Sequence, residues 1–117
     1  MTRLYSLLLT MLCVLLVALG QVLFKMAAIR SQVASGASAW ERWFNLPLLF
    51  ALIIYGVATL LWIWVLRSVA LNVAYPLFAL AFMIVPLLAY FFLNEPLSVR
   101  QLIGGAIIVL GVAISYA

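Results

Sequence analysis

Long apolar runs with almost no charge inside them fill most of this 117-residue sequence. The four runs cover about residues 4–25, 46–66, 69–93 and 101–117. A helix needs roughly 20 residues to cross a hydrocarbon core about 30 Å thick. Because lipid offers no partners to backbone N–H and C=O groups, each run is expected to be a helix. The sequence therefore predicts an all-α membrane protein that forms a single domain of four transmembrane helices.

Charge is too scarce here to cover a soluble surface. Apolar residues make up 71% of the chain and charged residues only 7%, whereas soluble domains carry about 25% charged residues. The six basic residues are scattered, and each lies near the end of an apolar run, where cations meet lipid headgroups. Trp40 and Trp43, in the predicted loop Met26–Asn45, indicate a segment along the membrane interface. We therefore expect membrane lipids as partners and no nucleic acid.

The inventory of side chains also argues against catalysis. The sequence has no histidine, so the usual general base and the commonest metal ligand are missing. Cys13 is the only cysteine, which excludes an intramolecular disulfide. Both acidic residues, Glu41 and Glu95, lie outside the apolar runs. We expect no enzyme activity, no cofactor, no metal site and no membrane-buried carboxylate for exchanging protons.

Two polar residues near the end of the first run are candidates for binding a substrate. Gln21 and Lys25 are four residues apart, so they lie on one helix face. Lys25 either reaches the headgroups from the end of the span, or faces a cavity as a cation suited to a phosphate. Gln21 favours the cavity, because an amide one turn deeper gains nothing from facing lipid.

Aromatic residues and a proline mark the second and third runs. Tyr55 and Trp62 are seven residues apart and share a helix face, so both could line a cavity. Tyr75, near the start of the third run, is either a third cavity residue or an anchor at the interface. Pro86 lies in the middle of that run and frees the carbonyl of Phe82. It predicts a kink, which is either a hinge or a static bend.

The fourth run carries a stripe of mostly small residues, Gly104, Ile108 and Gly111. Small residues let helix backbones approach closely in a bilayer, so the stripe predicts a helix–helix contact, within one chain or between two. Four helices of this length hardly enclose a path for a substrate, and we therefore expect a dimer. Short connections after the second and third runs predict that the helices pack as neighbours in chain order.

Several motifs together resemble the drug/metabolite transporter superfamily in its four-helix form. They are Gly20 to Lys25, Val73-Ala74-Tyr75, Asn94-Glu95-Pro96-Leu97, and the glycines of the fourth run. The Asn-Glu-Pro-Leu turn is typical of the EamA-type branch. In small multidrug resistance exporters, an essential glutamate lies three residues before a glycine corresponding to Gly20. That position is Val17 here, so the resemblance does not imply proton-coupled export of cationic drugs.

A second resemblance concerns the pattern Gly20, Gln21 and Lys25. It is similar to that of the small paired subunits that flip aminoarabinose-phosphoundecaprenol across the inner membrane of Gram-negative bacteria. The resemblance implies a flippase for an anionic lipid-linked sugar of the polyprenyl-phosphate type. Gln21 and Lys25 would meet the phosphate or the sugar, with the aromatic candidates along the path. Glu95 would instead order the last turn at the interface.

The same resemblance implies a multi-pass protein of the bacterial inner membrane. It would be a homodimer, or a heterodimer with a related small subunit, and the two chains could be antiparallel. Two alternatives remain open at this point. One is a small multidrug-type exporter of amphipathic compounds with another form of coupling. The other is a membrane scaffold subunit that does not itself transport.

Overall fold

The computed structural model describes residues 2–33 and 44–116, in which every regular element is a helix. The helices are α1 (Thr2–Val33), α3 (Leu46–Leu66), α4 (Leu71–Phe78), α5 (Ala81–Leu93) and α6 (Val99–Ser115). Three stretches are long and apolar enough to cross a membrane, one each in α1 and α3 and one formed by α4 with α5. The fourth, α6, is a shorter apolar helix of 17 residues. The predicted all-α, multi-pass membrane architecture is confirmed.

The first helix continues beyond the predicted end of its span. It runs past Lys25 to Val33, so the segment that was expected to begin a loop at Met26 is helical. Residues 26–33 contain good helix formers and neither glycine nor proline, which explains the extension. The rest of the predicted loop, with Trp40 and Trp43, lies outside the described residues.

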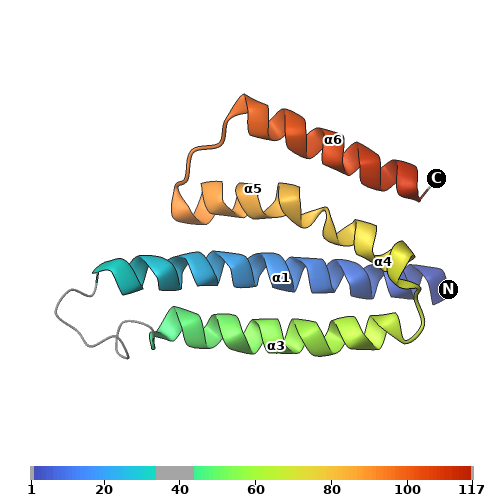
Figure 1. Ribbon diagram of the computed structural model, residues 1–117, viewed down its shortest axis with the longest axis horizontal. Coiled ribbons are helices and arrows are strands. Elements are labelled where there is room, and N and C mark those ends of the chain that lie inside the picture. The colour runs from blue at the N-terminus through green and yellow to red at the C-terminus, as the bar shows by residue number, and fades with distance from the viewer. Residues whose placement is uncertain (1, 34–43, 117) are drawn as a thin grey trace.

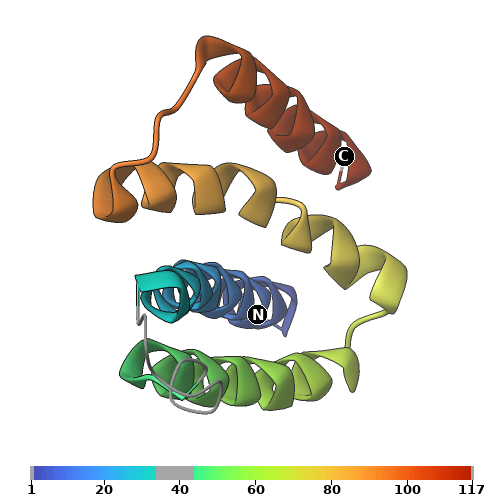
Figure 2. The same cartoon turned by 60° about the vertical axis from the view of Figure 1, so that its left-hand side comes forward.

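The helices form a thin row rather than a round bundle. The Cα atoms extend over 54 × 36 × 18 Å. Figure 1 shows the spatial order α3, α1, α5 and α6, so that α1 lies between α3 and the third span. Packing in chain order was therefore a wrong prediction for α3 and α5, whereas α3 does contact α4 through the rings of Trp62 and Phe78. Figure 2 shows α6 as the outermost helix, on the side of α5 away from α1.

The closest packing joins α1 to α3. Its buried side chains are small: Cys13 of α1 has its Sγ atom 3.9 Å from the Ala58 carbonyl oxygen, and Ala51, Ala58 and Val65 are buried on α3. The three α3 residues recur every seven positions and so form one stripe on the helix. Small side chains allow two helices to approach closely in lipid, where packing drives their association. This pairing fixes the α1 and α3 faces relative to each other.

Gly20 is the position in this contact where a larger side chain should do most damage. A Cβ atom there would lie 2.7 Å from Cδ2 of the Tyr55 ring. We expect Gly20→Ala to displace the ring and to lower the free energy of unfolding by about 1–3 kcal/mol. Gly56→Ala is the matched control, because a Cβ atom at Gly56 meets nothing within 4 Å. Unfolding in detergent, followed by circular dichroism, measures the difference, and equal stability of both variants would contradict the expected clash.

The third span is interrupted at Ala79 and Leu80. Their N–H groups bond to carbonyls three residues back, at 3.0 and 3.1 Å, which is the tighter 3₁₀ pattern. The interruption lies between Pro76 and Pro86. Pro86 itself is inside α5, so the helix breaks upstream of the predicted kink. Whether the span bends during function stays a prediction.

The α5–α6 turn explains the Asn-Glu-Pro-Leu motif. Asn94 ends α5 in the left-handed conformation, with φ of 54°, which asparagine tolerates better than most residues. The next N–H group, of Glu95, bonds to the Ala89 carbonyl at 3.2 Å. Ser98 then caps α6, and Gln101 completes a capping box with it. The turn is thus built from backbone geometry and caps.

The face of α6 that packs against the chain is not the predicted stripe. Gly105 is buried, and a Cβ atom there would collide with Sδ of Met83. By contrast, a Cβ atom at Gly104 or Gly111 would meet nothing within 4 Å. Within residues 2–33 and 44–116, the stripe of Gly104, Ile108 and Gly111 therefore has no close contact at its glycines. Of its two interpretations, contact between chains stays a prediction.

Candidate functional site

Gln21 and Tyr55 form the polar centre of the α1–α3 contact. Nε2 of Gln21 donates a hydrogen bond of 2.7 Å to the Tyr55 hydroxyl. The Tyr55 ring also packs against Phe24, with the ring centroids 5.1 Å apart, and lies over Gly20. Gly20 is needed here because it leaves room for the ring beside the α1 backbone. The structure thus joins two of the predicted site residues directly.

An open pocket of about 230 Å³ lies beside this pair. Three predicted residues, Tyr55, Trp62 and Tyr75, line it together. Phe78, which the sequence analysis missed, links them: its ring meets Trp62 edge-on at 4.4 Å and stacks on Tyr75 at 6.1 Å. The signal that could have revealed Phe78 is its spacing of three residues from Tyr75 on one helix.

Val17 also lines this pocket, one helical turn before Gln21. It stands where small multidrug resistance exporters carry a glutamate. None of the residues described around the pocket is acidic. The site therefore offers aromatic faces, hydroxyl groups and an amide. Such groups can hold a sugar ring by hydrogen bonds and apolar contact.

Lys25 continues the same α1 face toward the end of the bundle, where it meets an acid. Its Nζ atom lies 3.9 Å from Oε1 of Glu95, and the two side chains are 53% and 43% exposed. Glu95 therefore pairs with α1, beyond its predicted part in the turn. Exposed pairs of this kind contribute about 0–1 kcal/mol. An incoming anion can compete with Glu95 for the lysine at small cost.

A hydrogen bond from a side chain to the backbone also ties α1 to the start of α3 at this end. The Asn45 side chain accepts the N–H group of Leu48 as the α3 cap, at 3.0 Å. Its Nδ2 atom also donates to the carbonyl of Ala27 at 3.2 Å. Gln21, Lys25 and these links thus lie in one region, where α1, the start of α3 and the α5–α6 turn meet.

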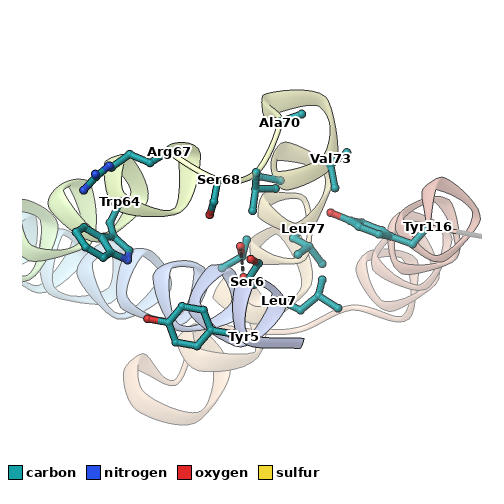
Figure 3. Close-up of a pocket in the computed structure, with 13 residues that line it drawn as sticks. Tyr5, Ser6, Leu7, Trp64, Arg67, Ser68, Ala70, Val73, Leu77 and Tyr116 are labelled. Carbon is teal, nitrogen blue, oxygen red and sulfur yellow. Dashed lines mark hydrogen bonds between the residues drawn. The ribbon is translucent and has the colours of Figure 1, made fainter. Parts of the chain in front are cut away.

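A larger pocket, of about 730 Å³, lies at the opposite end of the helices. Figure 3 shows it between the first turns of α1, the α3–α4 turn and the end of α6. Its polar lining includes Ser6, Thr10, Arg67, Ser68 and Tyr116. Sequence analysis missed it because these residues come from separate segments, none of which carries a motif.

The chain matches the model of the EamA-like transporter family over residues 1–117. It belongs to that family. The resemblance drawn from the Asn-Glu-Pro-Leu turn and the end of the first span is thereby confirmed. No solved structure matches this EamA-like chain.

Curated relatives of this EamA-like protein are named as flippase subunits. It is 40% identical over 98 residues to the probable 4-amino-4-deoxy-L-arabinose-phosphoundecaprenol flippase subunit ArnE of Sodalis glossinidius, covering 84% of this chain and 85% of the relative. It is 37% identical over 110 residues to the subunit of the same name from Pseudomonas fluorescens, covering 93% and 95%. The Aeromonas salmonicida subunit is 32% identical over 105 residues, or 90% of each chain. These names describe transport proteins.

Proposed function

We propose that this chain is a subunit of an inner-membrane flippase that moves an anionic lipid-linked sugar of the polyprenyl-phosphate type between leaflets. The names of the ArnE relatives support this substrate class. The observation that carries the proposal is the Gln21–Tyr55 hydrogen bond beside an aromatic pocket whose described lining has no acid. The chain acts as a transporter and not as an enzyme, and needs no cofactor.

In this proposal two parts of the site hold different parts of the substrate. Gln21 and Tyr55 offer hydrogen bonds to the sugar hydroxyl groups, and the faces of Trp62 and Tyr75 lie along the path. Lys25 is one turn further along α1, in the direction of the headgroups. It binds the phosphate, because a charge-assisted bond of about 2.7–2.9 Å is stronger than the looser contact with Glu95. The lysine exchanges partners when substrate arrives.

Two chains, a homodimer or a heterodimer with a related small subunit, form the working transporter. The 18 Å thin row of helices leaves the pocket beside Tyr55 open at one side, so a second chain is needed to close a path. The unpartnered glycines of the α6 stripe, Gly104 and Gly111, offer a face for close approach of that chain, around Ile108. Alternating access then bends the third span near its interruption and Pro86, without an acid that binds protons.

Removing the hydrogen bond between Gln21 and Tyr55 tests the proposal. We expect Gln21→Ala and Tyr55→Phe each to slow flipping of a polyprenyl-phosphate sugar about five- to tenfold, because a lost hydrogen bond costs about 1–1.5 kcal/mol. The double variant should be little slower than either single one, because both changes remove the same bond. Flipping is measured in membrane vesicles of cells that make the variant in place of the original chain.

Gln32→Ala is the matched control, because it removes an exposed amide from the same helix. Normal flipping by both site variants would contradict the site assignment. Loss of flipping with normal abundance and assembly would argue against the scaffold alternative.

Export of amphipathic cations is a second candidate function. The aromatic faces of Trp62, Tyr75 and Phe78 favour it, because such faces attract cations. The missing carboxylate at Val17 argues against it. Resistance of cells to quaternary ammonium compounds, gained on expression of this chain, would favour the exporter over the flippase.

A further inference from the structure

The pocket of about 730 Å³ beside Arg67 is not used by the transport site described above. Its size lies within the range of about 300–1,000 Å³ that is usual for small-molecule sites. Figure 3 shows Tyr116 reaching from α6 toward α4 with its hydroxyl foremost. In the same view Ser68 projects from the α3–α4 turn and Ser6 lies on α1. Groups from several helices therefore converge on one space.

Arg67 gives the rim of this pocket a positive charge. Its guanidinium carbon lies 4.8 Å from the centroid of the Trp64 ring, which also lines the pocket. In the described part of the chain, the ion pair present joins Lys25 to Glu95 at the opposite end. Arg67 thus has an aromatic platform without a described acidic partner. This arrangement leaves its charge available to an anion.

The start of α4 adds a partial positive charge on the same side. Its cap residue, Ala70, lines the pocket and supplies no side-chain cap bond. The N–H groups of Val73 and Ala74, which also line the pocket, both bond to the Ala70 carbonyl at 3.0 Å. The N-terminal end of a helix nevertheless carries a partial positive charge. Such an uncapped end favours phosphate. Together with the Arg67 guanidinium, it makes this region of the pocket electropositive.

The Tyr116 hydroxyl is an unpaired polar group at the edge of this pocket. Its oxygen is buried and has no hydrogen-bond partner among the residues that the structure describes. Buried polar groups are nearly always bonded, because an unpaired one has lost its water without compensation. Tyr116 also lines the pocket. A ligand oxygen that enters between Tyr116 and its neighbours would give this hydroxyl a partner.

We propose that this pocket is a second binding site for the phosphate headgroup of a lipid, the same lipid-linked substrate that Lys25 meets at the other end. The identity of the lipid rests on the proposed flippase function, whereas the phosphate follows from the pocket itself. Tyr5, which lines this pocket, and Lys25 are separated by about 30 Å along α1. This separation equals the thickness of a hydrocarbon core. The two cations thus mark one headgroup position near each membrane face.

Photochemical labelling of the whole chain in lipid nanodiscs tests this proposal. The probe is a polyprenyl phosphate with a diazirine on its first isoprene unit, and mass spectrometry locates the adducts. We expect two groups of adducts, one near Lys25 and one on residues 69–77 and Tyr116. Arg67→Gln should lower the second group about tenfold, as loss of a charged hydrogen bond does, and leave the first unchanged. Lys25→Gln should do the reverse.

Arg100→Gln is the control for loss of a positive charge, because Arg100 is exposed and does not line this pocket. It should leave both groups of adducts unchanged. Adducts near Lys25 alone would overturn the second site and leave the proposed function standing. Adducts at the Arg67 pocket alone would contradict the Lys25 site instead. Equal loss of both groups in Arg67→Gln would show misfolding or a single shared site, and would also overturn the proposal.

Tyr116→Phe provides a test that does not depend on charge. We expect it to lower labelling of the pocket about three- to tenfold, which is the effect of one neutral hydrogen bond. The melting temperature without ligand should stay equal or rise, because the hydroxyl has no described partner. Reduced melting temperature with unchanged labelling would overturn the assignment of this hydroxyl as a ligand.

Competing compounds identify the chemistry of the ligand. Dodecyl phosphate should displace the probe from the Arg67 pocket, whereas inorganic phosphate and dodecyl maltoside at the same concentration should not. Equal competition by inorganic phosphate would show a free-anion site and overturn the lipid. Equal competition by dodecyl maltoside would show an alkyl-chain site and overturn the phosphate.

Discussion

Lys25→Ala is expected to slow flipping of a polyprenyl-phosphate sugar at least about tenfold. The reason is the loss of a charged hydrogen bond to the phosphate, worth about 1.5–3 kcal/mol, since 1.4 kcal/mol changes an equilibrium tenfold. The chain itself should stay folded, because the lysine is half exposed and its pair with Glu95 contributes little. The initial flipping rate in vesicles, divided by the amount of the chain, measures the effect.

Two further variants separate phosphate binding from loss of the ion pair. Glu95→Ala breaks the same pair but keeps the lysine, so it should leave flipping unchanged or slightly faster. Arg30→Ala removes an exposed cation from the same helix and should have little effect. If Glu95→Ala were as slow as Lys25→Ala, the pair rather than the cation would matter. Phosphate binding by Lys25 would then be wrong.

Val17→Glu is expected to abolish transport of the anionic substrate. The new carboxylate would stand in the pocket, one turn from Gln21, and would repel a phosphate. A charge at the centre of a membrane helix also costs about 2.5–3.5 kcal/mol. We expect more than a roughly tenfold loss of flipping, measured as for Lys25. Transport of a quaternary ammonium cation, measured in parallel, should rise, since the aromatic pocket would now hold an acid.

The neutral variant Val17→Gln has a side chain of the size of glutamate and isolates the effect of charge. It should retain most of the flipping that Val17→Glu loses. An equal loss in both variants would show that size matters and charge does not. Normal flipping in Val17→Glu would contradict a substrate path through this pocket.

The helices could be predicted because the membrane relates sequence to structure directly. An apolar run of about 20 residues must form a helix in lipid. The end of α1 was harder to predict from the sequence. A cation such as Lys25 marks where a span meets water, but it does not mark where the helix stops. Nothing between Met26 and Val33 breaks a helix, so α1 continues past the lysine to Val33. The position of α1 between α3 and α5 results from packing between helices. It could not be predicted from any one apolar run in the sequence.

In the candidate site, too, features within one helix were predictable, whereas contacts between helices were not. The spacing of Gln21 from Lys25, and of Tyr55 from Trp62, gives the helix faces, and the structure joins Gln21 to Tyr55. The pairing of Lys25 with Glu95 was not predictable, because it needs the α5–α6 turn to lie beside α1. The Arg67 pocket depends in the same way on how the ends of four segments meet.

Two adjacent glycines in α6 show why the contacting face of a helix could not be predicted from the sequence. Gly104 and Gly105 look alike in the sequence, yet consecutive residues point about 100° apart around a helix. Gly105 packs against Met83, while Gly104 faces open space. Only the rotation of α6 about its axis decides which glycine contacts the chain.

The 18 Å thickness of the helix row has a consequence for evolution. In a chain with so little interior, few side chains are constrained by folding alone, and many large apolar ones are exposed. In the proposed pair of such chains, each would contribute one wall of the route. A duplicated gene can therefore change one wall while its sister keeps the other. Exchange of the partner would then alter what the transporter carries without a single substitution in this sequence.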